Sequence, residues 1–198
     1  MELFKLSRSE YSDFRRPAEA DGLRQTSKDI IQDDRHSEAP LFQLSKDHAA
    51  FMESGVGIIM ASRDAQNRPF LGRAIGCRVS LGSGQVKIFF SRRKYPLLLD
   101  AIRRTGAIAA SFSEPTSHKS LQIKAIGAEL ATVEDGDADV IARNLTLFTA
   151  ELERIHLNSA LPRTILACPP EDLAAVTFVP AVAFTQTPGP VAGNRIEA

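Results

Sequence analysis

The sequence predicts a mainly β fold of the α+β class, with six antiparallel strands in a closed or partly closed barrel and flanking helices. Two observations lead to this prediction. Six stretches are rich in β-branched and aromatic residues, which favour strands. Short turns of Gly, Asn, Asp and Pro join several of these stretches, as in antiparallel hairpins, and only a few helical patterns lie between them.

The composition is that of an ordinary globular domain. The 198 residues suffice for one substantial core, and the balance of 24 Lys+Arg against 24 Asp+Glu argues against a general binder of nucleic acids or anionic membranes. The two cysteines, Cys77 and Cys168, show no metal-ligand spacing and no disulfide framework, which suits a reducing compartment. Because no apolar run approaches membrane-spanning length and the first five residues lack a signal-peptide pattern, we expect a cytoplasmic protein.

The chain is expected to have three segments. Residues 1–40 are polar, mixed in charge and poor in large aliphatic side chains, so we interpret them as an arm that packs on something else, such as a second subunit. Residues 41–188 carry the strand and helix patterns of the predicted barrel domain. Residues 189–198 are expected to be a flexible tail.

The barrel domain is predicted to begin with a short helix and three strands joined by hairpins. Ser45 is a good N-cap for the helix, and Gly55 is a good residue to end it. Gly82 and Gly84 lie in a hairpin turn and are not a dinucleotide-binding motif, because no helix follows them directly. The three strands are expected at residues 56–62, 70–80 and 86–90, with a turn at 64–69.

The second half is predicted to contain two helices and three further strands. Pro96 suits the first turn of a helix over residues 96–105, and Gly106 suits its end. A longer helix is predicted over residues 138–157, where one apolar stripe is formed by Ile141, Leu145, Phe148, Leu152 and Ile155. The strands are expected at residues 107–113, 121–133 and 173–187, the last interrupted at Pro180, which suggests an edge or a bulge.

The turn after the third strand carries the strongest functional signal. Residues 91–94, Ser-Arg-Arg-Lys, lie between a buried strand and the helix that begins at Pro96. A helix N-terminus offers unpaired N–H groups and a partial positive charge, so a hydroxyl and cations placed there can bind a phosphate. Taken alone, the same four residues are equally compatible with a solvated basic turn. We call residues 91–94 the basic turn.

No arrangement of side chains for hydrolysis or metal binding stands out. There is no Gly-x-Ser-x-Gly motif, and the four histidines (His36, His48, His118 and His156) are scattered. An enzyme of this kind is expected to rely on a bound organic cofactor. Arg73, Arg78, Gln122 and Lys124 lie on predicted strands that a barrel can bring near the basic turn. Cations for a phosphate and an amide for a ring together suit a phosphorylated heteroaromatic cofactor.

Three local patterns resemble the pyridoxamine 5′-phosphate oxidase-like family of FMN-binding split barrels. Residues 73–78, Arg-Ala-Ile-Gly-Cys-Arg, resemble the family's Arg-x-x-x-x-Lys strand, with Arg78 in place of the lysine. Phe90-Ser91 and the following Arg93-Lys94 resemble the family's phosphate turn, in a shorter form. Residues 121–127 resemble the strand whose glutamine, here Gln122, reaches the flavin. The resemblance extends from about residue 45 to residue 187.

The resemblance implies a six-stranded antiparallel split β-barrel that forms a homodimer, with FMN in a groove between the subunits. It implies an FMN-dependent oxidoreductase acting on a small molecule. The family's C-terminal substrate segment, with its Trp and Arg-x-His, is absent, so pyridoxamine phosphate is not the expected substrate. The cofactor-binding residues implied are Arg73, Ala74, Arg78, Phe90, Ser91, Arg93, Lys94, Gln122 and Lys124, and no metal ligand or catalytic residue is assigned.

Alternatives remain open at this point. The same fold suits a flavin or haem carrier without turnover, for which His118 is a candidate haem ligand, and it suits a deazaflavin. A cofactor-free interaction protein, with the barrel used for dimerisation, is a further alternative of a different class. The residues do not identify a substrate or an electron acceptor.

Overall fold

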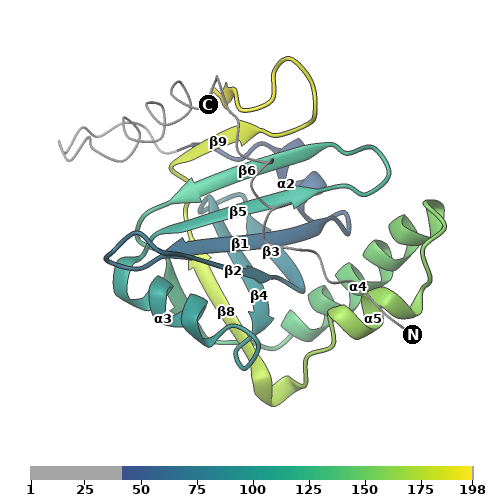
Figure 1. The fold of residues 1–198 in the computed structure, drawn as a ribbon, viewed down its shortest axis with the longest axis horizontal. Coiled ribbons are helices and arrows are strands. Elements are labelled where there is room, and N and C mark those ends of the chain that lie inside the picture. Colours follow the sequence, from purple (N-terminus) through teal and green to yellow (C-terminus); the bar gives the residue numbers. More distant parts are fainter. Residues whose placement is uncertain (1–41, 198) are drawn as a thin grey trace, which may run out of the picture. The chain divides into compact units, whose positions relative to one another are not determined.

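The computed structural model describes residues 42–197, which form two antiparallel sheets with helices beside them (Figure 1). The α+β class and the antiparallel pairing predicted from the sequence are therefore confirmed. The arm predicted for residues 1–40 lies outside the described residues. None of the helices in the described part is both long and apolar enough to cross a membrane.

The large sheet has six strands in the spatial order β10-β9-β6-β5-β1-β2. The small sheet has four strands in the order β3-β4-β8-β7. The strands of the large sheet are β1 (Gly57–Arg63), β2 (Pro69–Arg73), β5 (Ile108–Ser113), β6 (Ser120–Ala125), β9 (Val182–Thr185) and β10 (Arg195–Ile196). Those of the small sheet are β3 (Gly76–Ser80), β4 (Gln85–Ser91), β7 (Glu129–Ala131) and β8 (Leu173–Phe178).

Three predicted strands are divided between the two sheets. The predictions of unbroken strands at 70–80 and 121–133 are wrong, and the interruption predicted at Pro180 in the stretch 173–187 is confirmed. Each of the three stretches bends and supplies one strand to each sheet. At the first bend, the N–H of Ala74 donates to the carbonyl of Ile58 in the large sheet (3.0 Å), and the next N–H donates to Phe89 in the small sheet (2.8 Å). Gly127, with φ 90°, lies at the second bend, and Pro180 lies at the third.

When each bent stretch is treated as one continuous strand, neighbouring strands are paired in a closed circuit. The path runs from β1 through β2 and β3 to β4, β8 and β7, and then through β6 and β5 back to β1. A single closed barrel of six strands is not confirmed, because the hydrogen-bonded strands form two separate sheets.

The first two helices of the described part begin where local sequence signals indicate, and the later helices differ from the prediction. Helix α2 (Lys46–Met52) begins after the N-cap Ser45, and α3 (Pro96–Thr105) ends at Gly106, whose φ is 62°. Helix α4 (Asp137–Arg154) ends earlier than predicted. Helix α5 (Ala160–Ile165) and the short 3-10 helix η1 (Pro170–Asp172) lie where the sequence predicted a loop.

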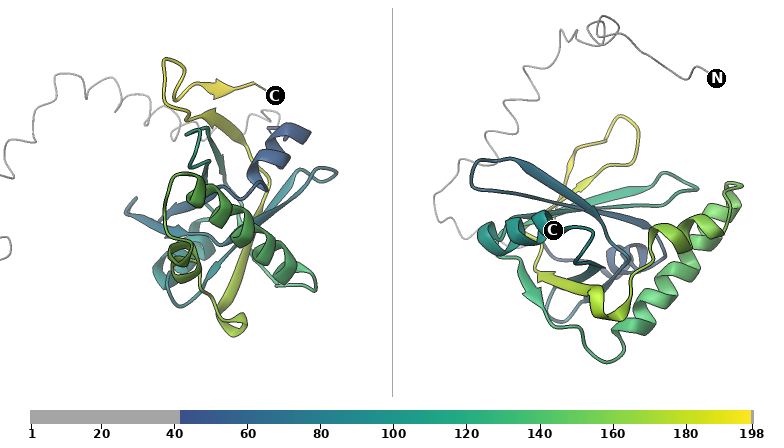
Figure 2. Two further views of the ribbon diagram at one scale, coloured as in Figure 1. Left: turned by 90° about the vertical axis from the view of Figure 1, so that its right-hand side faces the viewer. Right: turned by 60° about the horizontal axis from the view of Figure 1, so that its bottom comes forward.

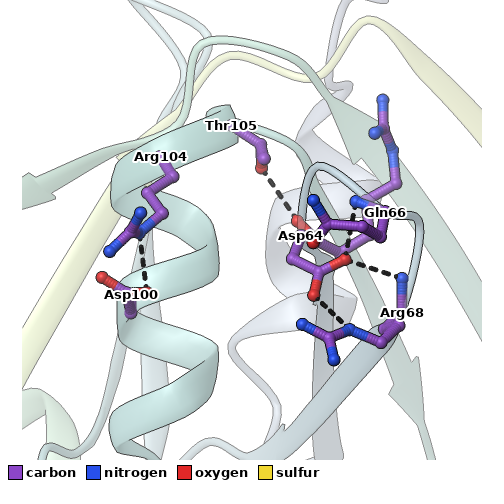
Figure 3. A network of polar contacts seen from close by, with 7 residues as sticks. Asp64, Gln66, Arg68, Asp100, Arg104 and Thr105 are labelled. Atoms are coloured by element: carbon purple, nitrogen blue, oxygen red, sulfur yellow. Dashed lines mark hydrogen bonds and ion pairs between the residues drawn. The ribbon is translucent and has the colours of Figure 1, made fainter.

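Polar contacts fix the turn between β1 and β2 and the end of α3 (Figure 3). The Asp64 carboxylate accepts from the N–H groups of Gln66 and Arg68, both at 2.9 Å, and from the Arg68 Nε at 2.6 Å. The Thr105 hydroxyl donates to the Arg63 carbonyl oxygen at 3.2 Å, which ties α3 to the end of β1. The turn predicted at residues 64–69 is confirmed.

Strand β4 separates two hydrophobic cores. The first core lies between the sheets and includes Phe90, while the second lies between the small sheet and α4 and includes Phe89. Successive side chains of a strand point to opposite faces, so β4 is buried on both sides from Val86 to Ser91. Figure 2 shows α4 running along the outside of the domain. The basic turn therefore follows the most deeply buried strand of the small sheet.

Candidate functional site

The predicted site residues lie in three separate groups. Arg73, Gln122 and Lys124 are on the large sheet, Arg78 is on the small sheet near the start of α4, and Ser91, Arg93 and Lys94 are in the basic turn. Ala74 is 2% exposed and Phe90 is fully buried, so their side chains belong to the core between the sheets. Within residues 42–197, no hydrogen bond or ion pair joins one of these groups to another.

The basic turn binds a carboxylate from its own chain. The Ser91 hydroxyl donates to Asp172 Oδ2, and the N–H of Arg93 donates to Asp172 Oδ1 at 2.7 Å. The Arg93 Nε lies 3.4 Å from the same oxygen. The hydrogen-bond donors of the predicted anion site are therefore present, and in this structure they bind the carboxylate of Asp172.

Strand register explains why Asp172 reaches the turn. Ser91, the last residue of β4, pairs with Leu173, the first residue of β8. Asp172 directly precedes β8, and the N–H of Arg92 donates to its carbonyl oxygen at 2.8 Å. The carboxylate is thus carried to the turn by the neighbouring strand. Sequence reasoning missed Asp172, because only the pairing of β4 with β8 brings it near.

The hydrogen bonds to Asp172 set its protonation. The bond from the Ser91 hydroxyl lowers the pKa of Asp172 most, burial opposes this, and the N–H and charge of Arg93 lower the pKa further. The pKa of Asp172 is therefore below its ordinary value, and the carboxylate is charged at neutral pH.

Lys94 also has internal partners. Its ammonium donates to the carbonyl oxygens of Ile165 (3.1 Å) and Ala167 (2.8 Å) at the end of α5. A cation there satisfies free carbonyl groups and suits the helix dipole. The main-chain N–H of Lys94 donates to the Ser91 hydroxyl at 3.2 Å, so the first and last residues of the basic turn are hydrogen-bonded to each other.

Arg78 lies in a second ion cluster at the start of α4. Its Nη2 is 3.0 Å from Asp137 Oδ1 and donates to the Gly136 carbonyl at 3.1 Å. Lys87, opposite Arg78 in the β3–β4 ladder, lies 2.8 Å from Asp137 Oδ2. Lys87 is four residues before Ser91 on β4, a separation of roughly 13 Å along an extended strand. Arg78 therefore does not join the basic turn.

A small cavity adjoins Arg78. Its volume is about 230 Å³, and it lies between the end of α2, β3 and α4. Its lining residues are Glu53, Cys77, Arg78, Val140, Arg143 and Asn144. This volume is below the roughly 300 Å³ at which pockets for drug-sized ligands begin.

The outer face of the large sheet brings Arg73 and Gln122 into one row. The ladder aligns Arg73, Ile59, Ser111, Gln122 and Phe184 across five strands. Side chains opposite one another in a ladder share a face. Arg73 and Gln122 are three strand spacings apart, roughly 14 Å. Figure 1 shows that no described helix covers β1, β5 and β6 on this side.

Neighbouring side chains hold Gln122 in place. Its amide nitrogen donates to the Ser111 hydroxyl at 3.2 Å, and its oxygen accepts from the Gln186 amide at 3.4 Å. On the next row of the same face, the Lys124 ammonium lies 4.8 Å from the ring centroid of Phe184. Within residues 42–197, no carboxylate forms an ion pair with Arg73. The face therefore offers an oriented amide between two cations.

The remaining candidates have structural surroundings. His118 is exposed in the turn between β5 and β6, with φ 59°. Burial raises the pKa of the Cys77 thiol, which donates to the Met52 carbonyl at 3.2 Å. In the part of the chain that the structure describes, no group of three or more His, Cys, Asp and Glu side chains is placed to hold a metal ion.

The comparisons found similar solved structures but no sequence relative. No protein-family model and no curated protein matches the chain. HupZ of Group A Streptococcus has 13% identity and a TM-score of 0.46, over 76% of this chain and 99% of that chain. A putative pyridoxamine 5′-phosphate oxidase from Lactobacillus delbrueckii has 14% identity and a TM-score of 0.44, over 72% and 93%.

A third similar structure is a pyridoxamine 5′-phosphate oxidase-related, FMN-binding protein from Nostoc punctiforme. It has 11% identity and a TM-score of 0.42, over 77% of this chain and 94% of that chain. The resemblance predicted from the three sequence patterns is thus also found among solved structures. At these identities and TM-scores it assigns neither a cofactor nor an activity to this chain.

Proposed function

We propose that the chain is a split-barrel flavoprotein, a cytoplasmic FMN-dependent oxidoreductase acting on a small molecule. The observation that carries the proposal is the row of Arg73, Ser111 and Gln122 across the face of the large sheet that no helix of residues 42–197 covers. The split-barrel assignment is supported by the path of strand pairing, which returns to β1 through the bends between β2 and β3 and between β7 and β6.

The hydrogen-bonding groups and charges on this face are of the types that bind a phosphorylated heteroaromatic cofactor. The Gln122 amide is fixed by Ser111 and Gln186 and presents a donor and an acceptor to a ring. The Arg73 guanidinium, about three strand spacings away, suits a phosphate at the far end of the same molecule. Lys124 and Phe184 add a cation and an aromatic surface beside Gln122. In the bound state FMN supplies the redox chemistry, and the chain binds and orients it.

The other predicted contacts are weaker candidates for this role. Arg78, Ser91, Arg93 and Lys94 each have partners within the chain that use some or all of their donors. The resemblance implies them as cofactor contacts, but the proposal gives them no part in holding the cofactor. The proposal therefore rests on the residues of the large sheet.

We propose that a second copy of the chain covers the same face. Leu71, two residues from Arg73 on this face, is 62% exposed. Ile59 on the neighbouring strand β1, and Val182 and Phe184 on β9 near the other edge of the sheet, are partly exposed on the same face. A homodimer buries this apolar surface and closes a groove over the row. Light scattering of the purified protein tests this: a monomer at all concentrations contradicts the homodimer.

The proposed cofactor is tested by an absorbance scan of the purified protein and by titration with FMN, followed by quenching of flavin fluorescence. Arg73→Ala and Gln122→Ala are each expected to weaken FMN binding by about tenfold or more, because each removes a hydrogen bond to the cofactor. Arg103→Ala, an exposed cation on α3, is the matched control and is expected to leave the affinity unchanged. A colourless protein that takes up no FMN contradicts the proposal. A Soret band on haem titration that His118→Ala abolishes favours the haem carrier instead.

A further inference from the structure

Asp172 is held in the basic turn as a bound anion is held. Its side chain is 4% exposed. The donors around it are the Ser91 hydroxyl, the Arg93 N–H and the Arg93 Nε. A hydroxyl, a main-chain amide and a guanidinium are also the groups with which proteins bind phosphate and sulfate. The two carboxylate oxygens therefore stand where two oxygens of a tetrahedral anion would be bound.

The main chain fixes Asp172 in this position. Its N–H donates to the Pro169 carbonyl at 2.9 Å, and its own carbonyl accepts from the Arg92 N–H at 2.8 Å. The next residue, Leu173, begins the ladder between β8 and β4 by pairing with Ser91. The main chain of Asp172 therefore stays beside the turn as long as β8 is paired with β4, the strand that ends in the turn.

We propose that the basic turn is an oxyanion-binding turn whose occupant is the chain's own Asp172 carboxylate, and that Asp172 excludes free phosphate groups from it. A phosphate approaching the turn finds the Ser91 hydroxyl, the Arg93 N–H and the Arg93 Nε already bound to Asp172, and it meets a like charge. The presence of Ser, Arg and Lys before a helix therefore does not make this turn a phosphate site. The inference does not depend on flavin binding, but it assigns the phosphate of a bound FMN to Arg73 and not to the turn.

Removal of the carboxylate is expected to open the site. In Asp172→Ala the donors of Ser91 and Arg93 lose their internal anion, while three cations remain in the turn. The matched control is Glu171→Ala, which changes the net charge equally at an exposed neighbouring position that makes no hydrogen bond within the described residues. Both variants and the wild-type protein are titrated with inorganic phosphate at constant ionic strength and followed by the NMR signal of the Arg93 amide.

Asp172→Ala is expected to bind phosphate saturably, with a shift of the Arg93 amide signal. The wild-type protein and Glu171→Ala are expected to show no saturation at the Arg93 amide over a concentration range reaching at least about tenfold beyond that which saturates Asp172→Ala, because their turn keeps its own anion. Adding Ser91→Ala to Asp172→Ala is expected to weaken the new site. A folded Asp172→Ala that does not bind phosphate overturns the proposal.

The wild-type protein provides a test that does not depend on any variant's folding. Saturable phosphate binding at its Arg93 amide overturns the proposal, because the turn is then open with Asp172 in place. If Asp172→Ala does not fold, Asp172→Ser, which keeps a small polar side chain, is tested for the same gain of binding. Failure of FMN uptake by the wild-type protein contradicts the flavin proposal and leaves these phosphate titrations unaffected.

Discussion

The ammonium of Lys87 lies 2.8 Å from the carboxylate of Asp137, and both side chains are withdrawn from solvent. Asp137 is fully buried and also pairs with Arg78, so two strands of the small sheet are joined to the start of α4 by one carboxylate. Asp137→Ala leaves the buried ammonium of Lys87 with only the exposed carboxylate of Glu134, 3.2 Å away, and is expected to lower the free energy of unfolding by about 2 kcal/mol. Urea denaturation measures this loss. Asp139→Ala, an exposed carboxylate in the same helical turn, is the control, and an equal loss there contradicts the prediction.

The stability of the protein is expected to fall in acid because of Asp172. Its pKa is lowered in the folded state, mainly by the Ser91 hydrogen bond, so the folded state binds fewer protons than the unfolded chain. The stabilisation is complete above the unfolded pKa of about 3.8 and is lost as the pH falls through the lowered folded pKa. Urea denaturation at pH 6, 5, 4 and 3 measures the free energy of unfolding. Between pH 6 and pH 3 this free energy is expected to fall less in Asp172→Asn than in the wild-type protein, because the variant lacks one titrating group. Identical pH profiles contradict this.

His48 is expected to destabilise the protein on protonation. Burial lowers the pKa of His48 most, and Lys119 lowers it further, while Asp47 opposes them. Its Nδ1 accepts from the Ser45 N–H at 3.2 Å, and a protonated ring cannot accept there. Because the folded pKa is lowered, the stabilisation is complete above the unfolded pKa of 6.5 and falls as the pH drops below it.

The variant His48→Gln tests this effect. Glutamine at this position keeps an acceptor for the helix cap but does not titrate. The difference in melting temperature between buffers above and below the ordinary histidine pKa is expected to be smaller in the variant than in the wild-type protein. If the difference in melting temperature is the same in the variant and the wild-type protein, His48 does not cause the pH dependence.

Gly55 allows the chain after α2 to pass closely by α4. A Cβ atom at Gly55 would lie 2.2 Å from the Cβ of Leu147 and 2.7 Å from the main chain of α4, and its φ is 86°. Gly55→Ala is expected to cost about 3 kcal/mol through overpacking and backbone strain together. Gly84→Ala is the control: its φ is 67°, but the nearest atom is 3.7 Å away, so only strain of about 1 kcal/mol is expected. Thermal unfolding measures both, and equal effects contradict the role of close packing.

Local sequence signals predicted those helix boundaries that depend on one residue. Ser45, Pro96 and Gly106 set helix boundaries through caps and fixed backbone angles, and the structure confirms them. The three bends were not predictable in the same way. Ala74 and Ile75 are consecutive apolar residues, as in an unbroken buried strand, and only their hydrogen bonds to different sheets show that the strand changes partner there.

The candidate site shows the same limit. The donors of the basic turn are adjacent in sequence, so their chemistry was predictable. Their partner Asp172 is 79 residues from Arg93 and depends on which strands pair. The row of Arg73 and Gln122 likewise depends on the register of strands between them. Residue types therefore predicted which groups bind anions, but not which anion.

Strand β4 is the wall shared by both cores, with Phe89 on one side and Phe90 on the other. A local opening that releases α4 exposes one side of this strand and leaves the other packed. Its amide protons are therefore expected to exchange with solvent only when the whole domain unfolds. Because the basic turn begins at the end of this strand, Ser91 keeps its place through partial openings that separate the outer elements.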